Sequence, residues 1–241
     1  MKIRAFLFLL FASSLAVRAD DQSQGIVQPF KQISVPSPVL QEIITEMVVD
    51  EGSEVKEGQV LVQLRNDRET LDVQLSDKLI DLKRFIAIGQ EKLYNEKMGS
   101  EEKSREAKTE LELAELTLKA KKLALDEKTI RSTMNGVVVR KYKESGESVD
   151  RQEKLLDIMN YDQVYVQFFV KPEFRKGLAE NAPAKVKIVD LDNAAFEGKI
   201  TFIDPRNEAA SGMVRLKVLL DNKDHRIKPG MKSLADFAPK P

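Results

Sequence analysis

The stretch of sequence that decides the fold occurs twice, as IITEMVVDEGSEV at residues 43–55 and as VVVRKYKESGESV at residues 137–149. Gly52 of the first copy aligns with Gly146 of the second, and the same offset continues into the apolar residues that follow, pairing Leu61 with Leu155 and Leu64 with Ile158. Each copy predicts a strand, an acidic turn, a short strand, a second turn and a third strand, because glycine supplies the positive φ that such a turn needs. One copy would expose too much apolar edge to be stable alone, so we expect the two copies to close on each other.

The segment between the copies has a different composition, since nearly half of its residues are charged and it contains no proline. Asn66 followed by Glu69 resembles a capping box, and Ser100 before two glutamates indicates a second helix start. Two runs of apolar residues keep helical spacing: Leu71, Leu75, Leu79, Leu82, Ile86 and Leu93, then Ala107, Leu111, Ala114, Leu118 and Leu125. We therefore predict an α-helical hairpin at residues 65–129, with its turn at 97–100, whose narrow apolar stripes pack as a long antiparallel coiled coil.

The C-terminal third returns to the two-residue period of β-strands. Apolar and polar residues alternate from Val164 to Val170 and again in three later runs, separated by turn sequences such as the one at residues 204–207. This pattern predicts a small antiparallel β-barrel at residues 160–237, followed by a tail at 238–241. The fold class is therefore mainly β plus an α-hairpin, with the repeated module formed by residues 34–64 and 130–159 and preceded by an N-terminal extension at 20–33.

The first residues have the features of a secretory signal. Lys2 and Arg4 precede an apolar run at residues 5–17, and the small residues Val17 and Ala19 flank Arg18. We predict a signal peptide at residues 1–19 with cleavage after Ala19. A retained membrane anchor is the alternative, although the apolar run is shorter than the roughly 20 residues that span a bilayer. No cysteine follows, so a lipoprotein anchor is excluded.

The composition argues against several classes of enzyme. The chain has 241 residues, with 39 basic and 39 acidic side chains, one histidine and no cysteine. It therefore has no disulfide framework, thiolate nucleophile or multi-histidine metal site, and its balanced charge gives no general attraction to nucleic acid. His225 lies in a polar turn next to Pro229-Gly230, which favours an exposed histidine over a general base. We predict no enzymatic activity and no bound cofactor or metal.

Three blocks of sequence resemble the periplasmic adaptor (membrane fusion) proteins of Gram-negative efflux and secretion systems. Residues 48–61 resemble the first half of a biotinyl-lipoyl-like domain, residues 129–138 resemble the strand that follows the family's hairpin, and residues 196–205 with 228–231 are similar to the adaptor β-barrel. The resemblance implies a lipoyl-like barrel-sandwich hybrid interrupted by the hairpin.

By the same resemblance, the chain would be a periplasmic protein, peripheral to the cell membrane, that links an inner-membrane transporter of the resistance-nodulation-division or ABC type to an outer-membrane channel protein. Several copies would assemble as a homo-oligomer. The hairpin tip would contact the outer-membrane channel, and the predicted partner-binding residues are Leu93, Lys97, Met98, Gly99 and Ser100. The sequence departs from the family pattern at Gly89, where export adaptors often carry an arginine.

Two other functions stay open. A lipoyl or biotinyl carrier domain needs a lysine at the turn that follows the first copy, but Arg68 falls there, and a guanidinium is not the primary amine that such acylation requires. An exported coiled-coil protein without a transport role would use the same hairpin for protein contact.

Overall fold

The computed structural model describes residues 22–237, so the predicted signal peptide at 1–19 and the predicted tail at 238–241 lie outside the described residues. The fold is mainly β with two long helices, as the sequence predicts. The chain divides into two compact units. Within the described residues, the hairpin unit consists of residues 29–163 and 222–225, and the β unit consists of 22–28, 164–221 and 226–237.

The hairpin unit contains a β module and two helices. The strands of the module are β2 (Glu42–Met47), β3 (Glu54–Val55), β4 (Val60–Leu64), β5 (Thr129–Arg131), β6 (Gly136–Lys141) and β7 (Ser148–Val149), with parts of β1 (Gln22–Pro36) and β8 (Lys154–Val170). One sheet has the order β5-β4-β2-β7, while β6 pairs with β3 on one side and with β8 on the other. All the recorded pairings within the module are antiparallel.

Backbone hydrogen bonds relate the two copies of the repeat by an approximate two-fold symmetry. The N–H of Gly52 donates to the carbonyl of Val138 at 2.8 Å, and the N–H of Gly146 donates to the carbonyl of Ile44 at 2.8 Å. Val138 and Ile44 stand at equivalent positions, and each donates its own N–H back into the turn of the other copy. Both glycines have positive φ, as the turn requires. The expectation that the copies close on each other is confirmed.

The core of the module is formed by residues of both copies. Ile44, Leu61 and Leu64 of the first copy are fully buried, as are Leu155 and Ile158 of the second. These side chains belong to one hydrophobic cluster. The apolar residues that align between the two copies in the sequence are therefore the residues that fill the core of the module.

The repeat also extends upstream of the segment that the sequence revealed. The hydroxyl of Ser37 donates to the carbonyl of Val39 at 3.1 Å, and the hydroxyl of Ser132 donates to the carbonyl of Met134 at 2.5 Å. The end of β1 is thus the counterpart of β5. After β4 the chain forms the two helices and then returns to the module through β5. In the second copy the equivalent strands are β8 and the end of β1, and both of these strands continue into the β unit.

The β unit is antiparallel where its pairings are recorded. Its strands have the order β1-β12-β9-β10-β11-β8, and β1 also pairs with β8. The elements are β9 (Pro183–Ile188), β10 (Ala194–Asn207), β11 (Val214–Asp221) and β12 (Lys232–Asp236), with two short 3₁₀ helices, η1 (Pro172–Gly177) and η2 (Val189–Leu191). The segment predicted as an N-terminal extension contributes most of β1. Closure of these strands into a barrel stays a prediction.

One predicted turn of the β unit is wrong. Residues 204–207 lie inside β10, which continues to Asn207, and its register against β11 shifts between Ile203 and Asn207. The Asp204 carboxylate explains the irregularity, because it accepts hydrogen bonds from the backbone and side chain of Arg206 and from the Arg215 guanidinium. A turn-forming sequence here produces a bulge.

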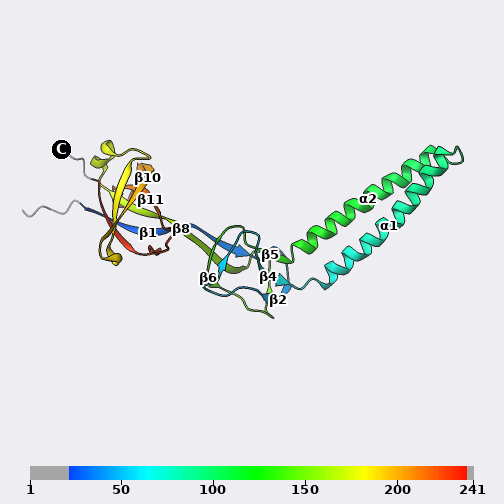
Figure 1. Ribbon diagram of the computed structural model, residues 1–241, viewed down its shortest axis with the longest axis horizontal. Helices are drawn as coiled ribbons and strands as arrows, with labels where there is room; N and C mark the ends of the chain where they lie inside the picture. The colour runs from blue at the N-terminus through cyan, green and yellow to red at the C-terminus, as the bar shows by residue number, and fades with distance from the viewer. Residues whose placement is uncertain (1–21, 238–241) are drawn as a thin grey trace, which may run out of the picture. The chain divides into compact units, whose positions relative to one another are not determined.

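The predicted hairpin is present as α1 (Asp67–Asn95) and α2 (Glu101–Asp126), which lie side by side and are joined by a short turn (Figure 1). Neither helix, nor any other helix within residues 22–237, is long and apolar enough to cross a membrane.

Candidate functional site

The two helices of the hairpin run antiparallel in a register fixed by ion pairs. Lys121 Nζ lies 2.7 Å from an Asp72 carboxylate oxygen near the base, and Lys83 Nζ lies 2.7 Å from a Glu110 carboxylate oxygen nearer the tip. Two further pairs, Lys108–Glu91 and Arg84–Glu115, link the helices. These contacts show which residues of α1 and α2 stand level with each other.

Small side chains form much of the contact between the helices. The buried residues are Ser76, Ile80 and Ala87 on α1 and Ser104, Ala107 and Ala114 on α2. Small residues let two helix backbones approach closely, so little apolar volume is enclosed between the helices. The prediction for α2 is confirmed at Ala107 and Ala114.

The predicted stripe on α1 is wrong. Leu71, Leu75, Leu79 and Leu82 are all exposed, although their spacing is that of a coiled-coil seam. The reason is that α1 carries a second row with similar spacing, at Ser76, Ile80 and Ala87, and the helix turns this row toward α2. The leucines consequently point away from the partner helix.

The tip of the hairpin has a well-defined backbone. The N–H of Met98 donates to the carbonyl of Leu93 at 2.8 Å, and the N–H of Lys97 donates to the carbonyl of Tyr94 at 2.9 Å. This pair of bonds is the Schellman arrangement that ends many helices, and it needs a left-handed residue that is usually glycine. Lys97 occupies that position with φ of 61°. The structure thus holds a lysine in a conformation that lysine disfavours.

Gly99 and Ser100 complete the turn. A Cβ atom added to Gly99 would lie 3.0 Å from Leu93 Cβ, so the close approach of the turn to the end of α1 favours glycine. Ser100 is the first residue before α2 and is extended, with its carbonyl accepting the N–H of Ser104 at 3.2 Å. Its hydroxyl makes no capping hydrogen bond to the helix.

The structure places all five predicted tip residues within this single turn and the last turn of α1. Met98 is 68% exposed, and Leu93 is exposed as well. Tyr94, which the sequence did not single out, is also exposed and supplies one of the carbonyls that close the turn. Periodicity could not single out Tyr94, because it falls outside the leucine row.

A buried cation fixes the base of the hairpin to the β module. Lys128, which follows α2, lies with its Nζ 2.6 Å from a Glu42 carboxylate oxygen on β2 and 3.2 Å from a Glu69 oxygen on α1. Arg65 Nε lies 3.2 Å from the other Glu42 oxygen. Asn66 occupies the N-cap of α1 as predicted but makes no side-chain capping bond, and Glu69, predicted as its capping partner, binds Lys128.

The ionisation of these groups follows from their contacts. Burial opposes the charged form of Glu42, but the hydrogen bond from Lys128, a backbone N–H and the charges of Lys128 and Arg65 outweigh it and lower the pKa of Glu42. Burial likewise opposes the charged form of Lys128, and hydrogen bonds to Glu42 and Glu69 outweigh it and raise the pKa of Lys128. The shifts favour the charged forms of both Glu42 and Lys128 across the neutral pH range.

The residues named for the alternative functions lie elsewhere. His225 Nε2 is 2.8 Å from Asp162 Oδ1, and its ring contacts the Tyr161 ring with a centroid distance of 4.7 Å. The hydrogen bond with His225 lowers the pKa of Asp162, against some opposition from burial. Arg68 lies in the first turn of α1. In the described part of the chain, no group of three or more acidic, histidine or cysteine residues could hold a metal ion.

Comparisons with known sequences find one matching domain family and several similar proteins. Residues 163–240 match the family described as the CusB-like beta-barrel domain. The antibiotic efflux pump periplasmic linker protein ArpA of Pseudomonas putida is 28% identical over 211 residues, covering 80% of this chain and 56% of the relative. The cobalt-zinc-cadmium resistance protein CzcB of Cupriavidus metallidurans is 21% identical over 209 residues, covering 80% of this chain and 40% of the relative. The chain thus spans a little more than half the length of ArpA and less than half the length of CzcB.

Solved structures share the fold. A MacA-MexA chimeric protein that contains the Pseudomonas aeruginosa MexA alpha-hairpin domain superposes with a TM-score of 0.79 at 15% identity, covering 90% of this chain and 80% of the other. The membrane fusion protein Spr0693 from Streptococcus pneumoniae R6 gives 0.72 at 16% identity, covering 91% and 99%. The resemblance predicted from the three sequence blocks is confirmed.

Proposed function

We propose that this chain, as a relative of the periplasmic adaptor proteins, is a non-enzymatic adaptor subunit of an efflux or secretion system. It would lie in the periplasm, peripheral to the cell membrane, and link an inner-membrane transporter of the resistance-nodulation-division or ABC type to an outer-membrane channel protein. Several copies would surround the transport path. The periplasmic linker named among its relatives supports this proposal.

The observation that carries the proposal is the insertion of the hairpin between the two halves of a symmetric, well-packed module. The 29 residues of α1 extend for about 43 Å at 1.5 Å per residue. Most of this length contributes nothing to the core of the module, whose buried cluster consists of strand and turn residues. The Lys128 cluster holds the helix ends at the module. A firmly rooted helical arm is suited to reaching a distant protein partner.

In this proposal the exposed tip residues contact the outer-membrane channel. Met98 and Leu93 offer apolar surface, and Lys97 adds a positive charge held in a fixed backbone position. The β unit would close as a small barrel and the helices would act as a coiled coil. Such a protein positions the two membrane components relative to each other, so any energy for transport would come from the transporter.

A pair of substitutions at the tip tests the proposal. The double variant K97E/S100R should lower efflux in cells that depend on this chain, because it reverses one charge and adds bulk at the proposed contact. The matched control is R151E, which reverses one exposed charge in a turn of the module. Folding is checked by circular dichroism of the purified variants. Unchanged transport in the folded double variant would contradict the proposed tip contact.

A further inference from the structure

Three arginine side chains of the β unit converge on one aspartate. Arg175 of η1 donates from its Nη2 to the Asp204 carbonyl at 2.7 Å, and Arg215 of β11 donates from its Nη2 to Asp204 Oδ2 at 2.9 Å. Arg206 of β10 donates from its Nε to Asp204 Oδ1 at 3.3 Å. Three elements of the β unit thus bring their guanidinium groups, which we call the arginine cluster, to the same place.

The arginine cluster carries more positive charge than Asp204 balances. The backbone N–H of Arg206 and the side chains of Arg206 and Arg215 outweigh the effect of burial and lower the pKa of Asp204, so its charged form is favoured. Within residues 22–237, none of the three arginines pairs with any other carboxylate. The nearby Glu208 carboxylate accepts a hydrogen bond from the Ser211 hydroxyl instead. Three guanidinium charges therefore stand against one carboxylate.

The arginines keep N–H donors that the protein does not use. A guanidinium has five N–H donors in a planar fork, and one of them in each arginine is bonded to Asp204. The Arg206 side chain is 82% exposed, so most of its fork faces solvent.

Arg215 is held in place by its neighbours and is still partly accessible. Its guanidinium lies over the Phe202 ring, 5.5 Å from the ring centroid, and its side chain is 37% exposed. Its Nε is buried and has no acceptor among the described residues, so the donors left for a ligand are those of the two Nη atoms. This guanidinium is thus fixed in position before any ligand arrives.

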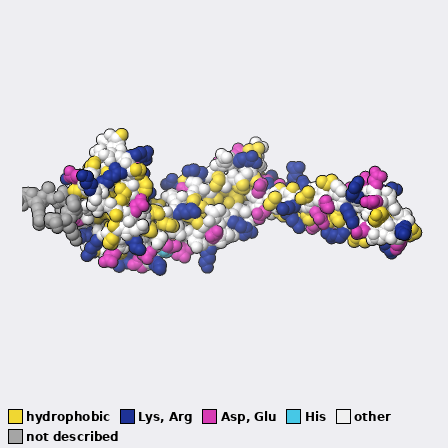
Figure 2. Space-filling model, turned by 90° about the horizontal axis from the view of Figure 1, so that it is seen from above, with side chains coloured by type: hydrophobic (Ala, Val, Ile, Leu, Met, Phe, Trp, Pro, Cys, Tyr) yellow, Lys and Arg dark blue, Asp and Glu magenta, His cyan; other side chains and the backbone are white. Residues whose placement is uncertain are grey.

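The face of the sheet beside the arginine cluster is also basic. Along β9 and β11 basic residues alternate with buried apolar ones, so the basic side chains point to the outer face. The basic residues of this face on β9, β10 and β11 are Lys185, Lys187, Lys199, Arg215 and Lys217. Glu197 lies opposite Lys185, and Asp221 stands at the end of β11 away from Arg215. Figure 2 shows Lys and Arg side chains among hydrophobic ones at the surface of the β unit.

The charge of the chain is divided unevenly between its two units. Within the described residues, the β unit has more basic than acidic residues, whereas the hairpin unit has more acidic than basic ones. A surface with an excess of one charge raises the local concentration of ions of the opposite charge. The β unit is therefore the unit to which an anion is drawn.

A phosphate group suits the chemistry of the arginine cluster. Guanidinium forks donate paired hydrogen bonds to phosphate oxygens, which is why arginine is favoured where phosphate is recognised. A phosphate monoester presents several strong acceptor oxygens and carries a charge of about −1.5 to −2 at neutral pH. Such a group can use the free donors of several arginines at once and offset their excess charge.

We propose that the arginine cluster is a binding site for a phosphate group, either free or on the headgroup of an anionic lipid. The arginines share the phosphate oxygens on the solvent side, while Asp204 keeps the guanidinium groups together. The lysines of the outer face draw the anion toward the cluster. This site goes beyond the proposed adaptor function and does not depend on it.

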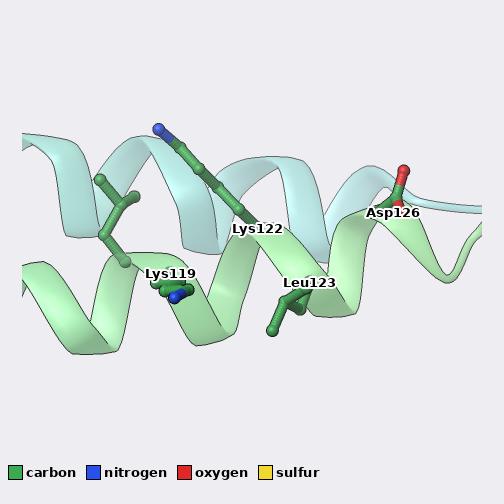
Figure 3. Close-up of a pocket in the computed structure, with 5 residues that line it drawn as sticks. Lys119, Lys122, Leu123 and Asp126 are labelled. Carbon is green, nitrogen blue, oxygen red and sulfur yellow. The ribbon is translucent and has the colours of Figure 1, made fainter.

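The hairpin provides a matched control position. A shallow groove on α2 is lined by Lys119, Lys122, Leu123 and Asp126, which are labelled in Figure 3, and by Leu118. Both lysines are exposed, and neither has an ion pair within the part of the chain that the structure describes. The variant K122Q therefore removes one exposed positive charge without touching the arginine cluster.

Isothermal titration calorimetry of the purified full chain with inorganic phosphate tests the site, against sodium chloride of the same ionic strength. R206Q should weaken phosphate binding about tenfold, since one hydrogen bond between charged groups contributes roughly that factor. R206K, which also serves if R206Q does not fold, keeps the charge but loses the fork and should retain part of the affinity. K122Q should bind phosphate like the wild type. Circular dichroism checks the folding of each variant.

Vesicles distinguish the two sources of the phosphate group. Cosedimentation with phosphatidylcholine vesicles that contain phosphatidylglycerol, weakened by R206Q and not by K122Q, would support the proposal and identify a lipid headgroup as the source. Binding of inorganic phosphate with the same dependence on Arg206, but without binding to vesicles, would support the proposal and identify a soluble phosphate.

Three results would overturn the proposal. The first is the absence of binding to both inorganic phosphate and the vesicles. The second is binding that R206Q and K122Q weaken equally, which would show a general attraction between charges. The third is a short glutamate peptide that binds as tightly as phosphate, which would show a surface for acidic proteins.

Discussion

The β module and the hairpin use the same apolar residue types in opposite ways. In the module Leu61 and Leu64 are fully buried against residues of the second copy, and reciprocal hydrogen bonds tie the copies together. In the hairpin Leu75 and Leu116 face outward, while small residues such as Ala107 fill the contact between the helices. The module encloses its apolar surface within the chain, and the hairpin presents it to the exterior.

This difference separates residues whose burial stabilises the fold from residues whose exposure contributes little to it. Burial of leucine stabilises a fold by roughly 1.5–3 kcal/mol per side chain, so a chain that leaves a whole row exposed forgoes that stabilisation unless another molecule covers the row. The ion pairs along the hairpin are all partly exposed to solvent and add little stability each. We infer that, within the hairpin unit, the module supplies more of the stability than the helices do.

The largest effect should come from matched leucine truncations in the two regions. L61A removes a fully buried side chain and should destabilise the chain by about 3 kcal/mol, because it leaves a cavity. L75A removes a side chain that is 69% exposed and should change stability by less than about 0.5 kcal/mol. Urea denaturation of the monomer measures both. An equal loss of unfolding free energy in the two variants would contradict the contrast between the module and the hairpin.

A similar effect is expected where the two regions join. K128M removes the cation between Glu42 and Glu69 and leaves two carboxylates close together at the base of the hairpin. We expect a loss of about 2–3 kcal/mol, below the usual range for a fully buried pair because water reaches the edge of the cluster. The control K78E changes an exposed lysine of α1 and should have little effect.

The pH dependence of that loss follows from the direction of each shift. The pKa of Glu42 is lowered on folding, so its contribution is present above the ordinary value of 4.5 and is lost as the pH falls through the folded-state value. The pKa of Lys128 is raised, so its contribution is present below the ordinary value of 10.5 and is lost as the pH rises through the folded-state value. The stability difference between wild type and K128M should be greatest between these limits. The difference should become smaller as the pH falls below 4.5 or rises above 10.5. A difference that stays the same at those extremes would contradict the assignment.

A smaller effect, of opposite sign in the two regions, is expected from glycine-to-alanine substitutions. In the module a Cβ at Gly136 would lie 2.6 Å from the Met159 carbonyl oxygen, so G136A should cost about 2 kcal/mol. In the hairpin nothing lies within 4 Å of a Cβ at Gly89, so G89A should stabilise α1 by about 0.5–1 kcal/mol. Thermal unfolding followed by circular dichroism gives both signs. Destabilisation by G89A would mean that α1 is packed more tightly than its exposure indicates.

The sequence was sufficient for the module and for the outline of the hairpin. The offset between Gly52 and Gly146 predicted two equivalent turns and the closing of the two copies on each other, since a glycine turn and a two-residue period are local properties. The turn at 97–100 was likewise predictable from the polar break between the two helical runs. The five tip residues followed from that turn, and their contact with a partner stays a prediction.

The sequence could not show which row of α1 faces α2. Leu71 and Leu75 lie on one heptad-like row and Ser76 and Ile80 on another, and hydrophobicity alone favours the leucines. The choice depends on how closely the backbones can approach, which is a tertiary property. The role of Lys128 was hidden for a similar reason, because Glu42 and Glu69 are distant from it in sequence and meet it only in the fold.

The most direct test of the proposed function is photo-crosslinking in intact cells from a probe residue placed at Met98, with a second probe at the exposed turn residue Arg151 as the comparison. The probe at Met98 is expected to capture an outer-membrane channel protein, and the probe at Arg151 is expected not to capture it. Absence of such a protein from the crosslinks at Met98, or its equal capture at Arg151, would contradict the proposed contact at the hairpin tip.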